Sequence, residues 1–305
     1  MLSPVSAPPA PTAPAVDHHQ HLFSPATAAL IGSVEIDAES LIGQLDAAGI
    51  GRATVLSTAY LFGSPNRTVE HEYELVRATN DWTSRQVARF PDRLRGCCGL
   101  NPLRDYALEE LARGAQDRHL RRGLKLHFGN SAVDYHDARH VAQLRRVFEA
   151  ANGFGMAIVV HMRASISRRL PYGRDEARIF LDDLLPAAPD VPVQIAHLSG
   201  AGGFGGDPPL DRALEVFVEA IAGDDPRATR LLFDVATSVT PEAPREERAR
   251  IARRLRELGL ERVLYGSDAA TPGNAPRDGW AAFRRLPLTA AELGTIAGNV
   301  APYVR

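Results

Sequence analysis

The chain has 305 residues, which is enough for one large domain or two smaller ones. Hydrophobic residues make up 45% of it and charged residues 24%, which is typical of a globular protein, and no apolar run approaches the roughly 20 residues that a membrane-spanning helix needs. The formal net charge of −2 at pH 7 gives no electrostatic reason to expect nucleic acid or an anionic membrane as a partner.

The N-terminal segment and the cysteines bear on where the protein works. Residues 1–15 are rich in proline and alanine, without a basic start or a continuous apolar stretch, so they lack the features of a signal peptide. We interpret them as a disordered arm ahead of one domain over residues 16–305. Cys97 and Cys98 are adjacent, which excludes a disulfide framework and is compatible with a reducing compartment. We expect a cytoplasmic protein, with an exported and trimmed form as the alternative.

Eight short apolar runs alternate with amphipathic stretches after this arm. The runs cover residues 15–19, 53–57, 95–100, 123–127, 157–161, 193–198, 231–235 and 262–267. Most do not alternate in polarity, which is typical of strands buried on both faces of a parallel sheet. The amphipathic stretches, residues 39–48, 69–89, 137–151, 211–222 and 245–258, indicate helices, and Gly49, Gly153 and Gly259 are placed to end three of them. This order predicts an α/β fold, a (β/α)8 TIM barrel, with a doubly wound open sheet as the alternative.

The first run leads into a histidine cluster. Because side chains alternate along a strand, His19 and His21 should point to one side and His18 to the other. Two imidazoles on one side of a rigid strand can bind a metal ion through their neutral nitrogens. A solvated histidine cluster or the remnant of a tag is the alternative.

Further polar residues follow the later runs at the point where each strand ends. They are Lys125 and His127 after the fourth run, His161 after the fifth, His197 after the sixth and Asp268 after the eighth. The carboxyl ends of the strands meet at one mouth of a barrel, where active sites are built. Asp234 ends the seventh run and is interpreted either as a helix cap or partner of an arginine, or as an outer support of the site.

These residues resemble the amidohydrolase superfamily. The closer likeness is to the amidohydrolase-related (amidohydrolase 2) metal-dependent hydrolases, the group that includes enzymes like aminocarboxymuconate semialdehyde decarboxylase. It spans about residues 15–305 and rests on Asp17-x-His19-x-His21, Gly123-Leu-Lys125-Leu-His127, Val160-His161, Ala196-His197, Gly266-Ser267-Asp268 and Gly298-Asn299.

The resemblance implies a role for each residue. His19, His21, His161 and Asp268 match the ligands of one divalent metal, expected to be zinc, with manganese and iron as alternatives. Three nitrogens and one carboxylate leave a position for water, whose pKa zinc can lower to about 7. Asp268 would also act as general base, and His197 would orient the water or polarise the substrate.

Lys125 and His127 have more than one interpretation. If Lys125 is carboxylated, as in some members of the superfamily, it could bridge two metals, with His161 and His197 serving the second. An unmodified Lys125 would bind a substrate carboxylate or pair with Asp268. His127 shares the face of Lys125, so at least one of the two should approach the pocket.

Arg163, two residues after His161, is predicted to bind a substrate carboxylate in a bidentate fork, with a solvated loop arginine as the alternative. The substrate is expected to be a small molecule. Oligomeric state stays open, with a homodimer favoured.

Three functions follow from these residues. The first is hydrolysis of an amide, ester or lactone by metal-activated water. The second is non-oxidative decarboxylation on the same barrel. The third is a dinucleotide-dependent oxidoreductase, because residues 200–205, Gly-Ala-Gly-Gly-Phe-Gly, fit the G-x-G-x-x-G pattern and Asp224 lies roughly 20 residues further on. A rim loop over the mouth is the simpler explanation of these glycines.

Overall fold

A computed structural model of the chain describes residues 13–268 and 275–305. Most of the arm predicted over residues 1–15 therefore lies outside the described residues. The strands are β1 Val16–Gln20, β2 Arg52–Leu56, β3 Leu94–Gly99, β4 Gly123–His127, β5 Ala157–His161, β6 Val193–Ile195, β7 Leu231–Asp234 and β8 Val263–Leu264. They lie side by side in chain order, each parallel to the next.

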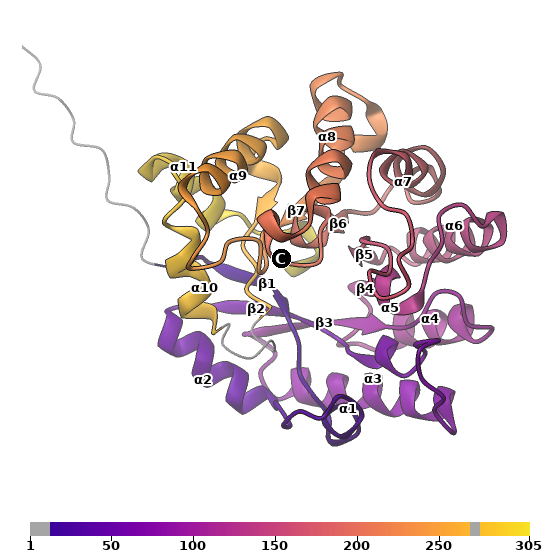
Figure 1. Ribbon diagram of the computed structural model, residues 1–305. Coiled ribbons are helices and arrows are strands. Elements are labelled where there is room, and N and C mark those ends of the chain that lie inside the picture. The colour runs from indigo at the N-terminus through magenta and orange to yellow at the C-terminus, as the bar shows by residue number, and fades with distance from the viewer. Residues whose placement is uncertain (1–12, 269–274) are drawn as a thin grey trace, which may run out of the picture.

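Helices surround this ring of strands (Figure 1). The α-helices are α1 Pro25–Ile31, α2 Ala38–Ala48, α3 Glu72–Ala88, α4 Ala107–Gln116, α5 Phe128–Ser131, α6 Ala138–Gly153, α7 Arg174–Ile179, α8 Pro208–Ala222, α9 Arg245–Leu258, α10 Pro276–Phe283 and α11 Ala290–Gly298. Short helical segments are η1 Ala59–Leu61, η2 Phe180–Leu184, η3 Leu185–Ala187, η4 Ala196–Ser199, η5 Phe204–Gly206, η6 Pro226–Ala228, η7 Leu260–Arg262 and η8 Pro302–Val304.

Backbone hydrogen bonds join the last strand region to the first and complete the barrel. The N–H of His18 donates to the carbonyl of Tyr265 at 2.9 Å, and the N–H of Asp268 donates to the carbonyl of His19 at 2.8 Å. The predicted (β/α)8 barrel is therefore confirmed, and all eight predicted strands are present.

Two of the predicted strands are shorter than expected by more than one residue. Run 193–198 forms a strand only to Ile195, and run 262–267 forms one only at Val263 and Leu264. After β6, His197, Leu198 and Ser199 take φ values of 54°, 50° and 72°, which no strand allows. The chain therefore leaves the sheet one residue before His197.

The ends of the predicted helices can be checked at three glycines. Gly49 follows α2 with φ 70° and Gly259 follows α9 with φ 86°, as predicted. Gly153 is instead the last residue of α6, and the left-handed residue that follows is Gly155, with φ 68°. The turn after α6 is therefore two residues longer than the sequence suggested.

The core has two parts. The larger part lies between the strands and the helices, and a smaller cluster inside the barrel contains residues such as Val16, Ala157, Tyr303 and Val304. Val16 and Ala157 begin β1 and β5, so the segment after α11 packs against the amino-terminal end of the barrel. Figure 1 marks the C-terminal end near the middle of the ring of strands.

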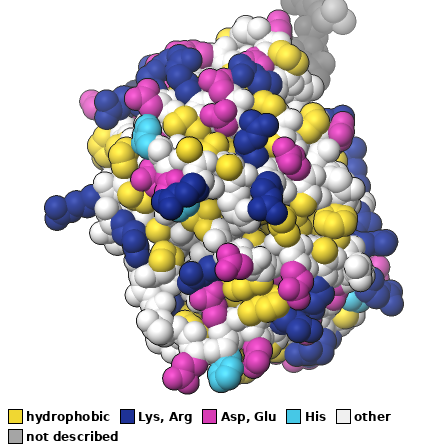
Figure 2. Space-filling view, turned by 90° about the vertical axis from the view of Figure 1, so that its right-hand side faces the viewer, with side chains coloured by type: hydrophobic (Ala, Val, Ile, Leu, Met, Phe, Trp, Pro, Cys, Tyr) yellow, Lys and Arg dark blue, Asp and Glu magenta, His cyan; other side chains and the backbone are white. Residues whose placement is uncertain are grey.

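Charge is mixed on the surface over α4, α6 and α7. Figure 2 shows Lys and Arg side chains interspersed with Asp and Glu side chains on this face. Ion pairs such as that of Arg174 with Glu219, at 2.7 Å between Nη2 and Oε2, join neighbouring helices.

Cys97 and Cys98 are free and buried, which confirms that they form no disulfide. No described helix has the length and apolar character to cross a membrane.

Candidate metal centre

The polar residues at the strand ends line one pocket at the carboxyl end of the barrel. The pocket has a volume of about 270 Å³. Its lining residues are His19, His21, Phe23, Ile31, Thr58, Tyr60, Leu61, Lys125, His127, His161, His197, Ala201 and Asp268. Residues from β1, β4 and β5 and from the segments after β6 and β8 thus meet at one place.

The histidines of the first strand alternate as the sequence predicts. The rings of His19 and His21 both face the pocket, with their centroids 5.2 Å apart. His18 points away from it, where its Nδ1 donates to the Tyr265 carbonyl at 3.0 Å and its Nε2 accepts from the N–H of Ala301 at 3.2 Å. His18 therefore serves the packing of the barrel and not the pocket.

His19, His21 and Asp268 form the set best suited to a metal ion. Each offers one ligand atom, and these atoms all lie within 4.8 Å of one another. The Nε2 of His21 is 3.7 Å from Oδ1 of Asp268. The Nδ1 atoms are engaged elsewhere: that of His19 donates to Asp234 Oδ2 at 3.0 Å, and that of His21 to the Leu56 carbonyl at 2.7 Å.

With Nδ1 protonated in both rings, their Nε2 lone pairs face the pocket, where that of His19 lies 3.3 Å from Nζ of Lys125. Burial, and then the charge of Lys125, lower the pKa of His19 and of His21 to about 3. Both rings are therefore neutral, which is the form that binds metals. The donor chemistry of this set fits a divalent cation.

His161, expected as the third nitrogen ligand, lies beside this set. Its ring stacks on His127 with a centroid distance of 3.8 Å and lies 5.0 Å from the ring of His197. Among the described residues, neither of the two groups of three ligand atoms that lie within 4.8 Å includes it. The ring of His197 is 4.7 Å from that of His19, so an unbroken series of imidazoles lines the pocket.

Asp234 contacts His19 on the side of the ring that faces away from the pocket. It belongs to the second group of close ligand atoms, with His19 and His197, but its carboxylate already accepts four hydrogen bonds. Oδ2 accepts from His19 Nδ1 and Gln194 Nε2, and Oδ1 from the N–H groups of His197 and Ala236. Burial alone would raise the pKa of Asp234, but His19 and these hydrogen bonds hold it below its usual value. Asp234 is therefore an ionised acceptor that orients His19.

Lys125 lines the pocket next to His19. Its Nζ lies 3.3 Å from the Nε2 of His19, and its side chain is buried. Burial lowers the pKa of Lys125 to about 8. His127 lies on the same side, so both residues of β4 line the pocket.

Arg163 has a partner within the chain. Its guanidinium forms a fork with Asp207, at 2.7 Å from Nε to Oδ2 and 3.1 Å from Nη2 to Oδ1, and lies 4.6 Å from the centre of the Tyr172 ring. The fork that was expected to bind a substrate carboxylate therefore meets a carboxylate of the protein. Arg163 lines a neighbouring cavity of about 370 Å³, which shares His127 and His161 with the metal pocket.

Two glycines of the loop after β6, Gly200 and Gly205, lie close to side chains of later segments. A Cβ added at Gly200 would lie 2.0 Å from Leu210 Cδ1, and one added at Gly205 would lie 2.0 Å from Glu247 Oε2. The N–H of Gly205 donates to Oε1 of Glu247 at 3.0 Å, so it already has an anionic partner. The loop therefore has internal partners at both of these glycines, which favours the rim-loop interpretation over the dinucleotide one.

Sequence reasoning did not identify Gln194 and Tyr303, which contact the residues behind the metal pocket. Gln194 donates to Asp234, and the hydroxyl of Tyr303 donates to Gln194. A polar glutamine in the middle of the apolar run 193–198 was the available signal, because a buried amide needs buried partners. Nothing near Tyr303 in the sequence points to a partner 109 residues away.

Comparisons with known proteins agree with this fold. The family described as Amidohydrolase matches residues 16–299. The fold is similar to that of 5-carboxyvanillate decarboxylase from Sphingomonas paucimobilis, with a TM-score of 0.65 and 17% identity over 94% of this chain and 97% of that chain. A comparison with curated proteins finds no matching sequence.

Two further solved structures are similar. One is a dihydroxybenzoic acid decarboxylase from a Polaromonas species, with bound manganese and the inhibitor 2-nitroresorcinol (TM-score 0.63, 16% identity, 94% of this chain and 95% of that chain). The other is a probable 2-pyrone-4,6-dicarboxylic acid hydrolase from Acinetobacter baumannii, with citric acid bound (TM-score 0.60, 18% identity, 92% of this chain and 95% of that chain).

Proposed function

The chain belongs to the amidohydrolase family, and we propose on this basis that it is a metal-dependent decarboxylase that releases carbon dioxide from a small aromatic carboxylic acid without an oxidant. Two of the similar structures are of 5-carboxyvanillate and dihydroxybenzoic acid decarboxylases, which supports this reaction. The observation that carries the proposal is the composition of the pocket, where an apolar wall faces a set of imidazole, ammonium and carboxylate groups.

The pocket suits an anion with one ring. Phe23, Ile31 and Leu61 supply the apolar wall, and its volume of about 270 Å³ is at the small end of ligand pockets. Lys125 is a cationic side chain in the lining of this pocket, next to His19. Its ammonium group would bind the carboxylate of the substrate and hold the ring against the apolar wall.

The reaction exchanges a carboxylate for a proton. The bond between the ring carbon and the carboxylate carbon breaks, its electron pair stays on the ring carbon, and carbon dioxide leaves. A proton must then be supplied to that carbon. Asp268, once it has taken a proton from solvent water, would pass that proton to the ring carbon, because its carboxyl group lines the pocket, 3.7 Å from His21 Nε2.

When bound, a divalent metal would supply positive charge to hold the anionic oxygens of the substrate. His19, His21 and Asp268 would hold this metal, with His161 as the further ligand expected from the family resemblance. We propose one ion per chain, zinc or manganese, because nitrogen and carboxylate ligands suit both. Elemental analysis of the purified protein tests this stoichiometry; two ions per chain would favour the site bridged by a carboxylated Lys125.

The proposed reaction can be tested with acids named in the similar structures. The protein, loaded with zinc or manganese, is incubated with 5-carboxyvanillate and with isomers of dihydroxybenzoate, and carbon dioxide and the decarboxylated product are measured. Metal-free protein and Asp268→Asn serve as controls. Release of carbon dioxide that requires the metal would support the proposal, and its absence with a wider panel of aromatic acids would contradict it.

Hydrolysis of a lactone, ester or amide is the second candidate. It is favoured by the likeness to the probable 2-pyrone-4,6-dicarboxylic acid hydrolase and by the carboxylate of Asp268, which is one of the proposed ligands and would also act as general base. The same protein incubated with 2-pyrone-4,6-dicarboxylate would open the ring and release no carbon dioxide. Ring opening at a higher kcat/KM than any decarboxylation would establish this second function in place of the first.

A further inference from the structure

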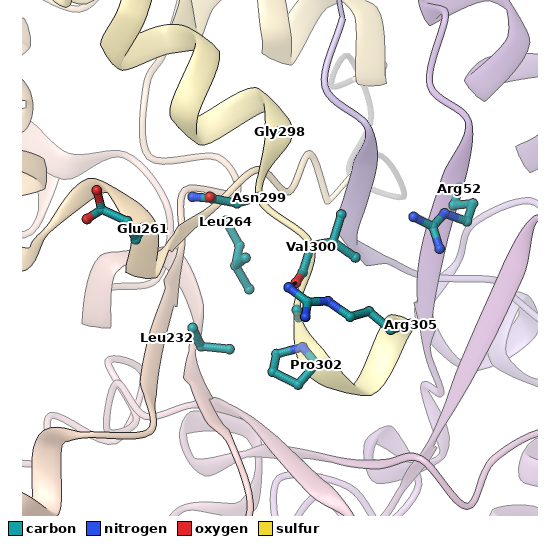
Figure 3. A pocket seen from close by; sticks show the side chains of 10 residues that line it. Arg52, Leu232, Glu261, Leu264, Gly298, Asn299, Val300, Pro302 and Arg305 are labelled. Atoms are coloured by element: carbon teal, nitrogen blue, oxygen red, sulfur yellow. Dashed lines mark hydrogen bonds between the residues drawn. The ribbon is translucent and has the colours of Figure 1, made fainter.

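A buried row of polar side chains leads from the amino-terminal end of the barrel to His19. It begins in η8, which packs against the inside of the barrel at the end opposite the metal pocket. Figure 3 shows the outer side of this region, where the segment from Gly298 to Arg305 passes between Leu232 and Arg52 and lines a cavity of about 520 Å³. Tyr303 lies in this segment, and its side chain is buried.

Each contact in the row joins a donor to an acceptor. The hydroxyl of Tyr303 donates to Oε1 of Gln194. The Nε2 of Gln194 donates to Oδ2 of Asp234 at 2.7 Å and lies 3.5 Å from the His18 carbonyl. Oδ2 of Asp234 accepts in turn from Nδ1 of His19 at 3.0 Å. Tyr303 is 7% exposed and the other three side chains of the row are fully buried, so water cannot replace these partners.

The order of donors and acceptors fixes the proton on His19. Because the Tyr303 hydroxyl occupies the carbonyl oxygen of the Gln194 amide, the amide nitrogen must face Asp234. Asp234 is a carboxylate and can only accept, so the hydrogen toward it must come from Nδ1 of His19. The Nε2 of His19 is then left with its lone pair directed into the metal pocket.

We propose that Tyr303 and Gln194 are positioning residues that fix the tautomer and ring orientation of His19 for metal binding, from the end of the barrel opposite the pocket. This inference rests on the proposed metal site. Its physical basis is that the hydrogen-bond partner of a metal-ligating histidine selects the nitrogen that binds the metal. Here the selection is relayed through a carboxylate and an amide to a tyrosine in the segment after the last helix.

Removing the hydroxyl of Tyr303 frees the Gln194 amide. Without a donor at Oε1, the amide is held only through its nitrogen, and its hydrogen bond to Oδ2 of Asp234 becomes longer and less well aligned. The Asp234 carboxylate is then free to tilt away from Nδ1 of His19, and without that acceptor His19 can populate the tautomer that is protonated at Nε2. That tautomer cannot bind a metal through Nε2.

The test is the affinity of the intact protein for Mn²⁺ and Zn²⁺, measured by competition with a chelating dye. We expect Gln194→Leu to weaken binding about tenfold, as for other partners of metal-ligating histidines, and Tyr303→Phe to weaken it about threefold, because it acts one step further away. Tyr303→Phe should have no further effect in the Gln194→Leu background, since the two residues act in series. Thermal unfolding of each variant gives its folded fraction at the temperature of the titration.

A matched control is Tyr265→Phe. Tyr265 is 1% exposed, and its hydroxyl also donates one hydrogen bond, to the Pro276 carbonyl at 2.7 Å, but that bond lies outside the row. This variant loses the same group and a comparable buried hydrogen bond, and its metal affinity should equal that of the wild type. An equal loss in Tyr265→Phe and Tyr303→Phe would overturn the inference, because a general loss of packing would explain both.

A second readout does not need the metal. Long-range ¹H–¹⁵N spectra of metal-free protein labelled with [¹⁵N]histidine distinguish the two tautomers, and His19→Gln identifies the His19 signal. The wild type should show His19 protonated at Nδ1, and Tyr303→Phe should show a mixture. A wild type that binds no metal would overturn the proposed function and this inference together, whereas unchanged affinity and tautomer in Tyr303→Phe would overturn this inference alone.

Discussion

Asp268 is held at the edge of the metal pocket by its own backbone and by the residue before it. Its N–H donates to the His19 carbonyl at 2.8 Å, and its φ of 54° lies in the left-handed region, which is uncommon for a side chain other than glycine. The hydroxyl of Ser267 donates to Oδ2 of Asp17 at 2.6 Å, which fixes the chain just ahead of Asp268. Strain of this kind is found where a functional side chain must point in one direction.

Asp268→Asn should therefore abolish turnover without changing the fold. Asparagine has the same shape but cannot carry a proton, and loss of a positioned acid or base lowers turnover by about 100-fold or more. Steady-state rates and metal content should be measured on the same sample, so that loss of proton transfer is separated from loss of metal. A variant with full metal content and wild-type turnover would contradict the role proposed for this carboxylate.

His197 gives a prediction that separates one metal from two. Its Nδ1 lies 2.8 Å from the Ala236 carbonyl, and its ring is 4.7 Å from that of His19. If His197 acts on the substrate and not on the metal, His197→Ala should lower turnover about 100-fold and keep the metal content of the wild type. Metal content is measured by elemental analysis after gel filtration. Loss of half the metal of a two-ion protein, or of all of it, would show that His197 is a ligand.

At the scale of elements, the ends of the strands were the least predictable part of the barrel. The run of apolar residues continues past β6, but three successive positive φ values, from His197 to Ser199, stop the strand after Ile195. The hydrogen bonds that hold this conformation come from distant segments, such as that from the Tyr172 hydroxyl to the Ser199 carbonyl. Such contacts leave no local pattern in the sequence, so only the start of β6 could be predicted.

Gly99, the last residue of β3, lies against the backbone of the segment that follows β2. A Cβ added at Gly99 would lie 2.4 Å from the backbone carbonyl oxygen of Ser57, which cannot move without displacing the segment after β2. We expect Gly99→Ala to lower the free energy of unfolding by about 2 kcal/mol or more, as overpacking of a core does. Denaturant unfolding followed by circular dichroism measures this change.

Gly43 provides the control for this substitution. It lies in the exposed face of α2, where an added Cβ would meet nothing within 4 Å. Gly43→Ala should raise the free energy of unfolding by about 0.5–1 kcal/mol because alanine favours the helix. If both variants changed stability in the same direction, the steric explanation for Gly99 would be wrong.

At the scale of the whole molecule, the sequence was sufficient to predict the barrel and to identify the residues that gather at its mouth. The alternation of strands and helices can be recognised from local patterns in the sequence. Because strand ends converge in any closed barrel, His19, His161 and Asp268 could be placed at one mouth from their positions alone. The partners of those residues could not be predicted. Arg163 meets Asp207 and Asp234 meets Gln194, and both pairings depend on how distant loops and strands pack.

The two cysteines test whether the barrel opens as one unit. Cys97 is 1% exposed and packs inside the barrel, whereas Cys98 is 0% exposed and lies on the outer face of β3, against Gly114 of α4. Burial raises the pKa of Cys97 to about 12 and that of Cys98 well above its usual value, so neither is a thiolate at pH 8 in the folded protein. Reaction with a disulfide reagent therefore requires the protein to open.

We expect both thiols of the native protein to react slowly with Ellman's reagent at pH 8 and at the same rate, and both to react at once in guanidinium chloride. The variants Cys97→Ala and Cys98→Ala report one thiol each, and the absorbance of the released dye measures the rate. Equal rates would mean that the inside of the barrel and its helical shell are exposed in a single event, as cooperative unfolding requires. Faster reaction of Cys98 would instead show that α4 detaches while the barrel, with the metal pocket at one end and η8 at the other, stays closed.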